Sequence, residues 1–223
     1  MCKSESHQEL HNGNSLFYTL SPSLLVAIVK AFNYQRGKEI GYQGYYEFGL
    51  FKGFSFWFAE QIGRAYYGET LYYYGFDSFE GLPESAVDDH INWMPGNYTA
   101  SIEFVIDQLE KNGMDFKRAK LFKGLFSASY FDQLKQDEAF LPVSICVIDS
   151  DIYESCVEVL SFIKDYLRVG SILVFDDYNA FDKADDHGER RALLEFEQDN
   201  PDFVKRHLFD FGRYGVVFKV VCI

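Results

Sequence analysis

Short apolar runs alternate with amphipathic segments along most of the chain, and this alternation is the feature that most restricts its possible folds. It predicts buried strands at 45–48, 71–76, 119–123, 143–148 and 172–175, with two more at 205–210 and 216–221. It predicts helices at 54–64, 98–112, 127–136, 155–167 and 188–199. Strands that alternate with helices form a mostly parallel sheet covered on both faces. Too few residues separate the last two strands for a parallel crossover, so they must pair as an antiparallel hairpin. We therefore predict a doubly wound α/β fold with a mostly parallel seven-stranded sheet that ends in an antiparallel hairpin.

One more helix is predicted before the first strand. Ser21 is its expected N-cap and Pro22 its first residue, and apolar side chains recur at helical spacing from Leu24 to Phe32. We see no linker and no internal repeat. We therefore expect one domain over 1–223, with 1–40 as an N-terminal helical cap.

Composition narrows the range of partners and compartments. With 223 residues, of which 48% are hydrophobic, the chain suits one domain with a large core. A formal net charge of -13 argues against a nucleic acid or an anionic membrane as the main partner. No apolar stretch is long enough to span a bilayer, and the polar start has no signal peptide, so we expect a cytoplasmic protein. Four cysteines without C-x-x-C spacing predict reduced thiols and no zinc site.

Carboxylates gather where two predicted strands end. Asp149 and Asp151 follow the strand at 143–148, and Asp176 and Asp177 follow the strand at 172–175. In an open parallel sheet this edge is where ligands bind. Each carboxylate resists ionisation beside the others, and a hard divalent cation such as Mg²⁺ is the simplest reason for the cluster. The sequence leaves open that Asp176 or Asp177 caps a turn, or that Asp151 caps the helix that follows it.

The first two strands end in a different pattern. Glu47 near the end of the first strand is followed by Gly49 and Gly53, which allow a tight turn close to a ligand. The pattern is not G-x-G-x-x-G, and the acid suits a ligand with an ammonium group. Asp77 ends the second strand, where an acid commonly accepts hydrogen bonds from ribose hydroxyls. Plain turn glycines and a turn-capping Asp77 are the alternatives.

Five motifs carry a resemblance to a known family. They are E-x-G-x-x-x-G-x-S from Glu47, D-S-F-E-G-L-P from Asp77, K-G-L-F from Lys123, D-S-D-I-Y-E-S from Asp149 and D-D-Y from Asp176. Over about 45–199 the chain resembles the class I S-adenosylmethionine-dependent methyltransferases, which have a Rossmann-like fold. Within them it resembles the macrocin O-methyltransferase type, which methylates sugar hydroxyls in macrolide and aminocoumarin antibiotic pathways.

The resemblance implies a role for each motif. It implies S-adenosylmethionine as the cofactor. The methionine part would be held by Glu47, Gly49, Gly53 and Ser55, and the ribose by Asp77 and Ser78. Phe126 would lie near the adenine, and Asp149 would lie at the edge of the same site. It implies metal ligation by Asp149, Asp176 and Asp177. Three carboxylates with remaining water positions suit octahedral Mg²⁺, and two adjacent hydroxyls of a substrate can replace two waters. Asp151 is the candidate general base, so Asp149 and Asp151 are the candidate catalytic residues.

The sequence therefore predicts a metal-dependent O-methyltransferase for a small-molecule hydroxyl, on a sugar or a glycosylated natural product. A catechol-type phenol O-methyltransferase and a non-catalytic cofactor-binding relative are the alternatives, and the missing G-x-G-x-x-G argues against a nicotinamide oxidoreductase. We expect segments 85–97 and 179–187 to border the acceptor site. Their histidines, His90 and His187, are expected to be solvated surface residues, with a contact to the substrate as the alternative. The aromatic residues around 42–57 and 66–79 are expected to be core, with a homodimer interface as a further possibility.

Overall fold

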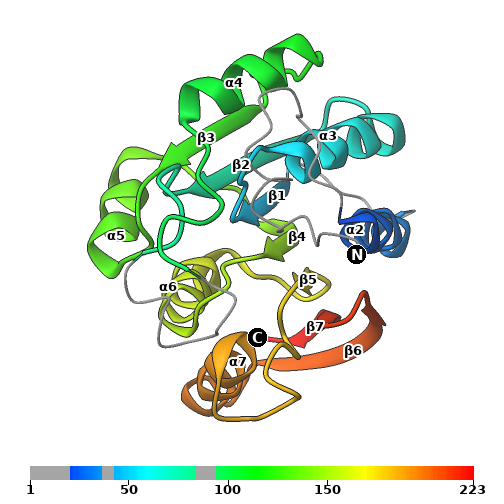
Figure 1. The fold of residues 1–223 in the computed structure, drawn as a ribbon. Helices are drawn as coiled ribbons and strands as arrows, with labels where there is room; N and C mark the ends of the chain where they lie inside the picture. Colours follow the sequence, from blue (N-terminus) through cyan, green and yellow to red (C-terminus); the bar gives the residue numbers. More distant parts are fainter. Residues whose placement is uncertain (1–20, 37–42, 84–93) are drawn as a thin grey trace, which may run out of the picture.

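A seven-stranded sheet forms the centre of the computed structural model, which describes residues 21–36, 43–83 and 94–223. The strands are β1 (Gln43–Phe48), β2 (Leu71–Asp77), β3 (Ala119–Lys123), β4 (Val143–Ile148), β5 (Ile172–Phe175), β6 (Val204–Phe211) and β7 (Gly215–Cys222). Their order is β3-β2-β1-β4-β5-β7-β6, and only β7 pairs antiparallel, with β5 and β6 (Figure 1). The predicted doubly wound sheet with a closing hairpin is confirmed. The strand order reverses between β1 and β4, which creates a crevice at their C-terminal ends.

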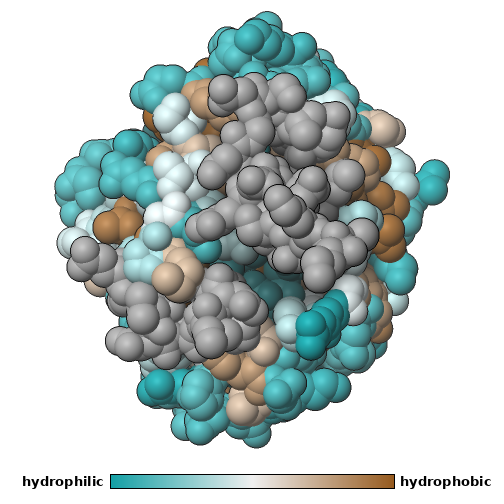
Figure 2. Space-filling view, in the orientation of Figure 1, coloured by the Kyte–Doolittle hydropathy of each residue, from teal (hydrophilic) through white to brown (hydrophobic). Residues whose placement is uncertain are grey.

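Helices cover both faces of the sheet. They are α2 (Pro22–Gln35), α3 (Phe54–Tyr67), α4 (Ile102–Lys111), α5 (Ala128–Asp137), α6 (Tyr153–Ile163) and α7 (Gly188–Asp199). One core cluster joins α2, α3 and α4 to the sheet, and a second joins α5, α6 and α7 to its other face (Figure 1). Figure 2 shows hydrophilic residues over α4, α5 and α7 at the rim of one face. The sheet is therefore the middle layer of three.

Alternating side chains on the strands fill these two cores. Tyr45 belongs to one cluster and Tyr46 to the other, and both are fully buried. The rings of Phe48 and Phe76 stack 4.5 Å apart at 11° across β1 and β2. Central strands buried on both faces read as continuous apolar runs, which is why the sequence revealed them. The expectation that most of these aromatic residues are core is confirmed.

Two helices begin at least two residues away from the predicted position, and α3 ends three residues later than predicted. The helix expected at 98–112 begins at Ile102, because Ser101 is its N-cap and accepts a hydrogen bond from the Phe104 N–H at 3.2 Å. The helix expected at 155–167 begins at Tyr153, and a 3-10 turn follows it at Lys164–Tyr166. The first difference matters for function, since it leaves Tyr98 outside the helix.

Helix α2 belongs to the core of the domain. Its side chains from Leu24 to Phe32 pack in the same cluster as α3 and α4, and Gln35 Nε2 donates to the Ser144 and Gly170 carbonyls at 2.8 and 2.9 Å. Ser21 stands at the N-cap as predicted, but its hydroxyl makes no cap bond. The rest of the expected cap, residues 1–20 and 37–40, lies outside the described residues. Within the described ranges, no helix has the length and apolarity needed to cross a membrane.

Candidate active site

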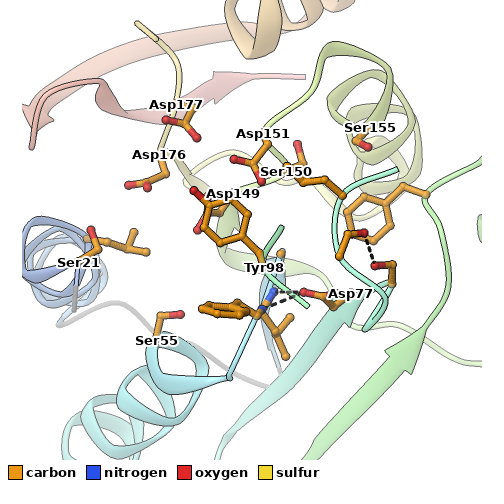
Figure 3. A pocket seen from close by; sticks show the side chains of 18 of the residues that line it. Ser21, Ser55, Asp77, Tyr98, Asp149, Ser150, Asp151, Ser155, Asp176 and Asp177 are labelled. Atoms are coloured by element: carbon orange, nitrogen blue, oxygen red, sulfur yellow. Dashed lines mark hydrogen bonds between the residues drawn. The ribbon is translucent and has the colours of Figure 1, made fainter. Parts of the chain in front are cut away.

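A cavity of about 450 Å³ opens at the C-terminal edge of β1, β2, β4 and β5. Its size and its place at the reversal of strand order suit a small-molecule site. The described residues that line it are Ser21, Leu24, Leu25, Gly49, Leu50, Phe51, Ser55, Asp77, Ser78, Gly81, Leu82, Pro83, Tyr98, Gly124, Leu125, Phe126, Asp149, Ser150, Asp151, Ser155, Asp176, Asp177, Ala180 and Tyr214. Five of these are aspartates, and none of the described ones is a lysine, arginine or histidine. Figure 3 shows Asp77 and Ser55 on one side and four aspartates on the other.

Gly49 follows β1 and lies in close contact with the backbone at the end of β4. Its φ is +90°, and a Cβ added there would lie 1.8 Å from the carbonyl oxygen of Asp149. Gly53 has a φ of +81° and is the N-cap of α3. A side chain at Gly49 would push the strand ends apart, so close backbone contact explains this glycine better than a plain turn does.

Glu47 is held behind the cavity wall. Its side chain is 1% exposed, and its two oxygens accept hydrogen bonds from the Tyr45 and Ser55 hydroxyls, both at 2.5 Å. Burial raises the pKa of Glu47 to about 7, although the two hydrogen bonds oppose the shift. Ser55 lines the cavity, while Glu47 is not one of the described lining residues. The structure thus brings the two predicted residues together, with Ser55 in front.

Asp77 organises the backbone around it. Its Oδ2 accepts from the Leu50 and Phe51 N–H groups at 2.7 and 2.9 Å, and its Oδ1 accepts from the Phe79 N–H at 2.7 Å. Burial raises its pKa, and these three backbone bonds counteract the shift. Asp77 thus caps its own turn through Phe79, as the alternative interpretation expected, and it also binds the glycine loop after β1 through Leu50 and Phe51. A carboxylate has about four acceptor positions, so the predicted ribose contact remains compatible with these bonds.

Ser78 and Phe126 also line the cavity. The Ser78 hydroxyl donates to the Gly81 carbonyl at 2.9 Å and so closes the turn after β2. The Phe126 ring meets Phe48 edge-on at 5.8 Å and stacks on Phe131 at 5.7 Å. Both residues lie on the cavity side that the resemblance gives to the nucleoside, and their contacts with it remain predictions.

The aspartates after β4 and β5 meet at the other side of the cavity (Figure 3). Asp149, Asp151 and Asp177 each offer one carboxylate oxygen, and these oxygens lie within 4.8 Å of one another. The predicted ligand set contained Asp176 in the place of Asp151. Asp176 lines the same cavity but is not a member of this closest group. Asp149 and Asp177 are common to both sets.

Burial and mutual repulsion raise the pKa values of these four carboxyls. Burial raises the pKa of Asp149 and of Asp151 well above the usual range, and the neighbouring aspartates add to the effect. Burial raises the pKa of Asp176 to about 6 and that of Asp177 to about 7. The side-chain interaction between Asp151 and Asp177 raises the pKa of Asp151 further and lowers that of Asp177. A bound divalent cation would offset this repulsion, so the donor set fits such an ion.

The backbone at Asp151 is strained. Its φ is +59°, and the Ile152 N–H donates to the Ser150 carbonyl at 2.6 Å, which closes a three-residue turn around Asp151. Such a conformation costs about 1–3 kcal/mol and is typical of functional sites. The N-cap of α6 is Ile152, and no side chain caps that helix. The interpretation of Asp151 as a helix cap is therefore wrong.

Three residues near the aspartates were not assigned to the site from the sequence: Tyr98, Tyr214 and Glu189. Tyr98 has a φ of +61°, its ring meets Phe51 at 5.6 Å, and it points toward the aspartates (Figure 3). Burial and the four aspartates raise its pKa to about 12. Tyr214 reaches the cavity from the β6–β7 turn, and Glu189 lies beneath Asp177. A signal existed only for Tyr98, since the N-cap serine three residues later excludes it from the helix.

The predicted acceptor-side segments are described only in part. Ala180 lines the cavity, whereas His187 stacks on Phe181 at 5.2 Å and is not one of the described lining residues. His90, Trp93 and residues 85–92 lie outside the described residues.

Comparison with known proteins identifies the family of the chain. The family model for macrocin O-methyltransferase (TylF) matches residues 43–219. No curated protein sequence matches the chain significantly. Among solved structures, the O-methyltransferase NovP superposes with a TM-score of 0.70 at 18% identity, over 88% of this chain and 79% of NovP. The calicheamicin methyltransferase CalS11 has a TM-score of 0.67 at 20% identity, over 87% of this chain and 77% of CalS11.

A third structure, the O-methyltransferase TomG from Streptomyces achromogenes in complex with SAM, has a TM-score of 0.61 at 13% identity, over 97% of this chain and 86% of TomG. At these identities the structures show a shared fold, and the family match covers most of the chain. The resemblance drawn from the motifs is confirmed. The chain belongs to the macrocin O-methyltransferase (TylF) family of S-adenosylmethionine-dependent O-methyltransferases.

Proposed function

We propose that the protein is a metal-dependent O-methyltransferase that methylates a hydroxyl of a sugar or of a glycosylated small molecule. The observation that carries the proposal is the convergence of Asp149, Asp151, Asp176 and Asp177 on a cavity whose other side is built around Ser55 and Asp77. A carboxylate cluster at the C-terminal ends of β4 and β5 suits a cation, and the glycine loop after β1 suits a cofactor.

The spacing of the carboxylate oxygens supports one shared ion. With Mg²⁺–oxygen bonds of about 2.0–2.1 Å, ligands on opposite sides of the ion lie about 4.2 Å apart. The oxygens of Asp149, Asp151 and Asp177 lie within 4.8 Å of one another, so a small closure brings them into range. This spacing supports Asp149 and Asp177 as ligands. We propose Asp176 as the third ligand, as the family resemblance implies, and Asp151 as the general base.

Different residues of this chain would have different roles in the reaction. When bound, S-adenosylmethionine supplies the methyl group, and the cation lowers the pKa of the acceptor hydroxyl. Asp151 would accept the proton of that hydroxyl, as a new oxygen–carbon bond replaces the sulfur–carbon bond. Ser55, held by Glu47, and the loop held by Asp77 would orient the donor. Alignment of oxygen, carbon and sulfur would then provide most of the rate enhancement.

The acceptor class rests on the relatives. CalS11 is described as a TDP-rhamnose 3'-O-methyltransferase, which is a sugar-hydroxyl reaction. We propose a hydroxyl of this kind here, with a neighbouring hydroxyl as the second oxygen on the cation. A catechol acceptor would present the same pair of oxygens on a flat ring, and a non-catalytic relative would bind the cofactor alone.

A methyl-acceptor screen tests the proposal. Release of S-adenosylhomocysteine would be measured with diol sugars, glycosides, nucleotide sugars and catechols, each with Mg²⁺ and with EDTA. We expect turnover on sugar hydroxyls that EDTA abolishes. Turnover on catechols alone would point to the catechol-type enzyme, and undiminished turnover in EDTA would contradict the metal mechanism.

Two variants separate ligand from base. Asp176→Asn is expected to weaken Mn²⁺ binding at least about tenfold, whereas Asp151→Asn should leave Mn²⁺ affinity within about threefold and still remove turnover. If Asp151→Asn weakened Mn²⁺ binding and Asp176→Asn did not, Asp151 would be the third ligand, in line with the close spacing of the Asp149, Asp151 and Asp177 oxygens.

A further inference from the structure

Glu189 is a buried carboxylate in contact with the backbone of Asp177, one of the proposed metal ligands. It lies in the first turn of α7, far along the chain from Asp149, and its side chain is 1% exposed. Its Oε2 accepts a hydrogen bond from the Asp177 N–H at 3.2 Å. Its Oε1 is buried and has no hydrogen-bond partner among the described residues. A buried polar atom without a partner is costly, so its presence calls for a physical reason.

Neighbouring cations do not provide that reason. Arg190 Nε donates to Asp185 Oδ1 at 2.5 Å, and Arg191 Nε donates to Glu195 Oε1 at 2.9 Å. Among the described residues, no ion pair includes Glu189. The N-terminus of α7 favours an acid in its first turn, but that effect is worth about 0.3–1 kcal/mol and does not require burial.

The hydrogen bond from the Asp177 N–H to Oε2 gives a reason for the carboxylate as a whole to be buried at this position. Asp177 follows β5 in a short stretch of irregular backbone, where no strand partner holds its amide. Glu189 connects this amide to α7, whose Ala192 and Leu193 are packed in the core. The direction of the Asp177 carboxylate depends on this backbone, since only two side-chain torsions separate them.

We propose that Glu189 is a positioning residue that fixes Asp177 for the divalent cation. The inference rests on the proposed function, because it requires Asp177 to be a metal ligand. Partners that orient metal ligands are worth about 10–100-fold in metal affinity.

Mn²⁺ binding to the full chain tests this role, followed by the electron paramagnetic resonance signal of the free ion. Glu189→Ala removes the acceptor and should weaken Mn²⁺ binding about tenfold or more. Glu189→Gln keeps a side-chain oxygen facing the Asp177 N–H and should stay within about threefold of the wild type. Glu195→Ala, on the same helix but half exposed, is the matched control and should bind like the wild type.

Two further measurements separate positioning from folding. Affinity for S-adenosylhomocysteine should be unchanged in all three variants, since the glycine loop lies on the other side of the cavity. Loss of that affinity in Glu189→Ala would mean that the substitution disturbs the whole fold, and would overturn the assignment. The thermal melting of the metal-free variants provides the same check.

The possible failures are distinguishable. Equal Mn²⁺ affinity in the wild type and Glu189→Ala would overturn the role of Glu189 and leave the metal centre in place. Equal losses in Glu189→Gln and Glu189→Ala would overturn the hydrogen-bond role in favour of the charge. A wild-type protein that binds no Mn²⁺ would overturn both this inference and the metal-dependent reaction.

Discussion

The two sides of the cavity carry the same type of side chain at the same edge of the sheet, yet they differ in what their carboxylates bind. On the side of β1 and β2, Glu47 and Asp77 accept five hydrogen bonds from hydroxyl and backbone N–H groups. On the side of β4 and β5, Asp149, Asp151, Asp176 and Asp177 face one another, and their mutual repulsion adds to the effect of burial in raising the pKa values of Asp149, Asp151 and Asp177. Glu47 and Asp77 therefore stabilise the local structure of the protein. The second group has acceptor oxygens left for a ligand, which is why we assign it to the cation and the reaction.

Replacement of an acid in the second group should have the largest effect. Asp149→Asn is expected to lower turnover by about 10³-fold, because it removes a proposed ligand charge beside the acceptor. Affinity for S-adenosylhomocysteine should stay within about tenfold, since the donors around Glu47 and Asp77 are untouched. Initial rates and calorimetry check both parts. Turnover close to that of the wild type would remove the distinction between the two sides.

Gly49 tests the junction between the two sides. Gly49→Ala would place a Cβ 1.8 Å from the Asp149 carbonyl oxygen at a φ of +90°, so we expect the free energy of unfolding to fall by about 3 kcal/mol. Gly113→Ala is the matched control, since Gly113 also has a positive φ, +79°, but has no atom within 4 Å of an added Cβ. It should cost about 1 kcal/mol. Equal losses in urea unfolding would mean that backbone conformation alone, and not the contact between strands, explains Gly49.

Asp77→Asn tests whether the side of β1 and β2 binds the cofactor. Asparagine has one acceptor oxygen, so at least one of the bonds from Leu50, Phe51 and Phe79 is lost. We expect S-adenosylhomocysteine to bind about tenfold more weakly, with Mn²⁺ affinity unchanged. Calorimetry with each ligand measures this. A loss of Mn²⁺ affinity instead would show that the two sides are one coupled site.

The pH dependence of stability should show the smallest effect, and its sign is fixed. The folded-state pKa values of Asp176 and Asp177, about 6 and about 7, lie above the ordinary aspartate value of 3.8. The folded state therefore binds protons more tightly, and this contribution is lost as the pH rises through these values. For these two groups, the metal-free protein should lose on the order of 1 kcal/mol between about pH 6.5 and pH 8.

Glu47, with a pKa of about 7, shifts stability in the same direction. Saturating Mg²⁺ should oppose the trend, because it binds the ionised carboxylates. Thermal melting across this range, with and without Mg²⁺, is the measurement. A metal-free stability that rises with pH would contradict the crowding of the four aspartates.

The sequence by itself determined the architecture and predicted several of the residues that line the cavity. Period-two and apolar patterns in the strands report burial on the two faces of a sheet, which is a local property of the chain. Parallel strands place the residue after each strand at one edge of the sheet, so the sequence predicts Asp77, Asp149, Asp176 and Asp177 at this edge, where they line the cavity.

The tertiary structure alone decided which of these side chains face one another. The strained turn at Asp151 brings its oxygen into the closest group in place of that of Asp176. Packing of α7 under β5 brings Glu189 to the Asp177 amide, and the β6–β7 turn brings Tyr214 to the cavity. These contacts join residues far apart in the chain and depend on side-chain direction to within an ångström or so. Local patterns report which face of an element is buried, and they carry no information on such distances.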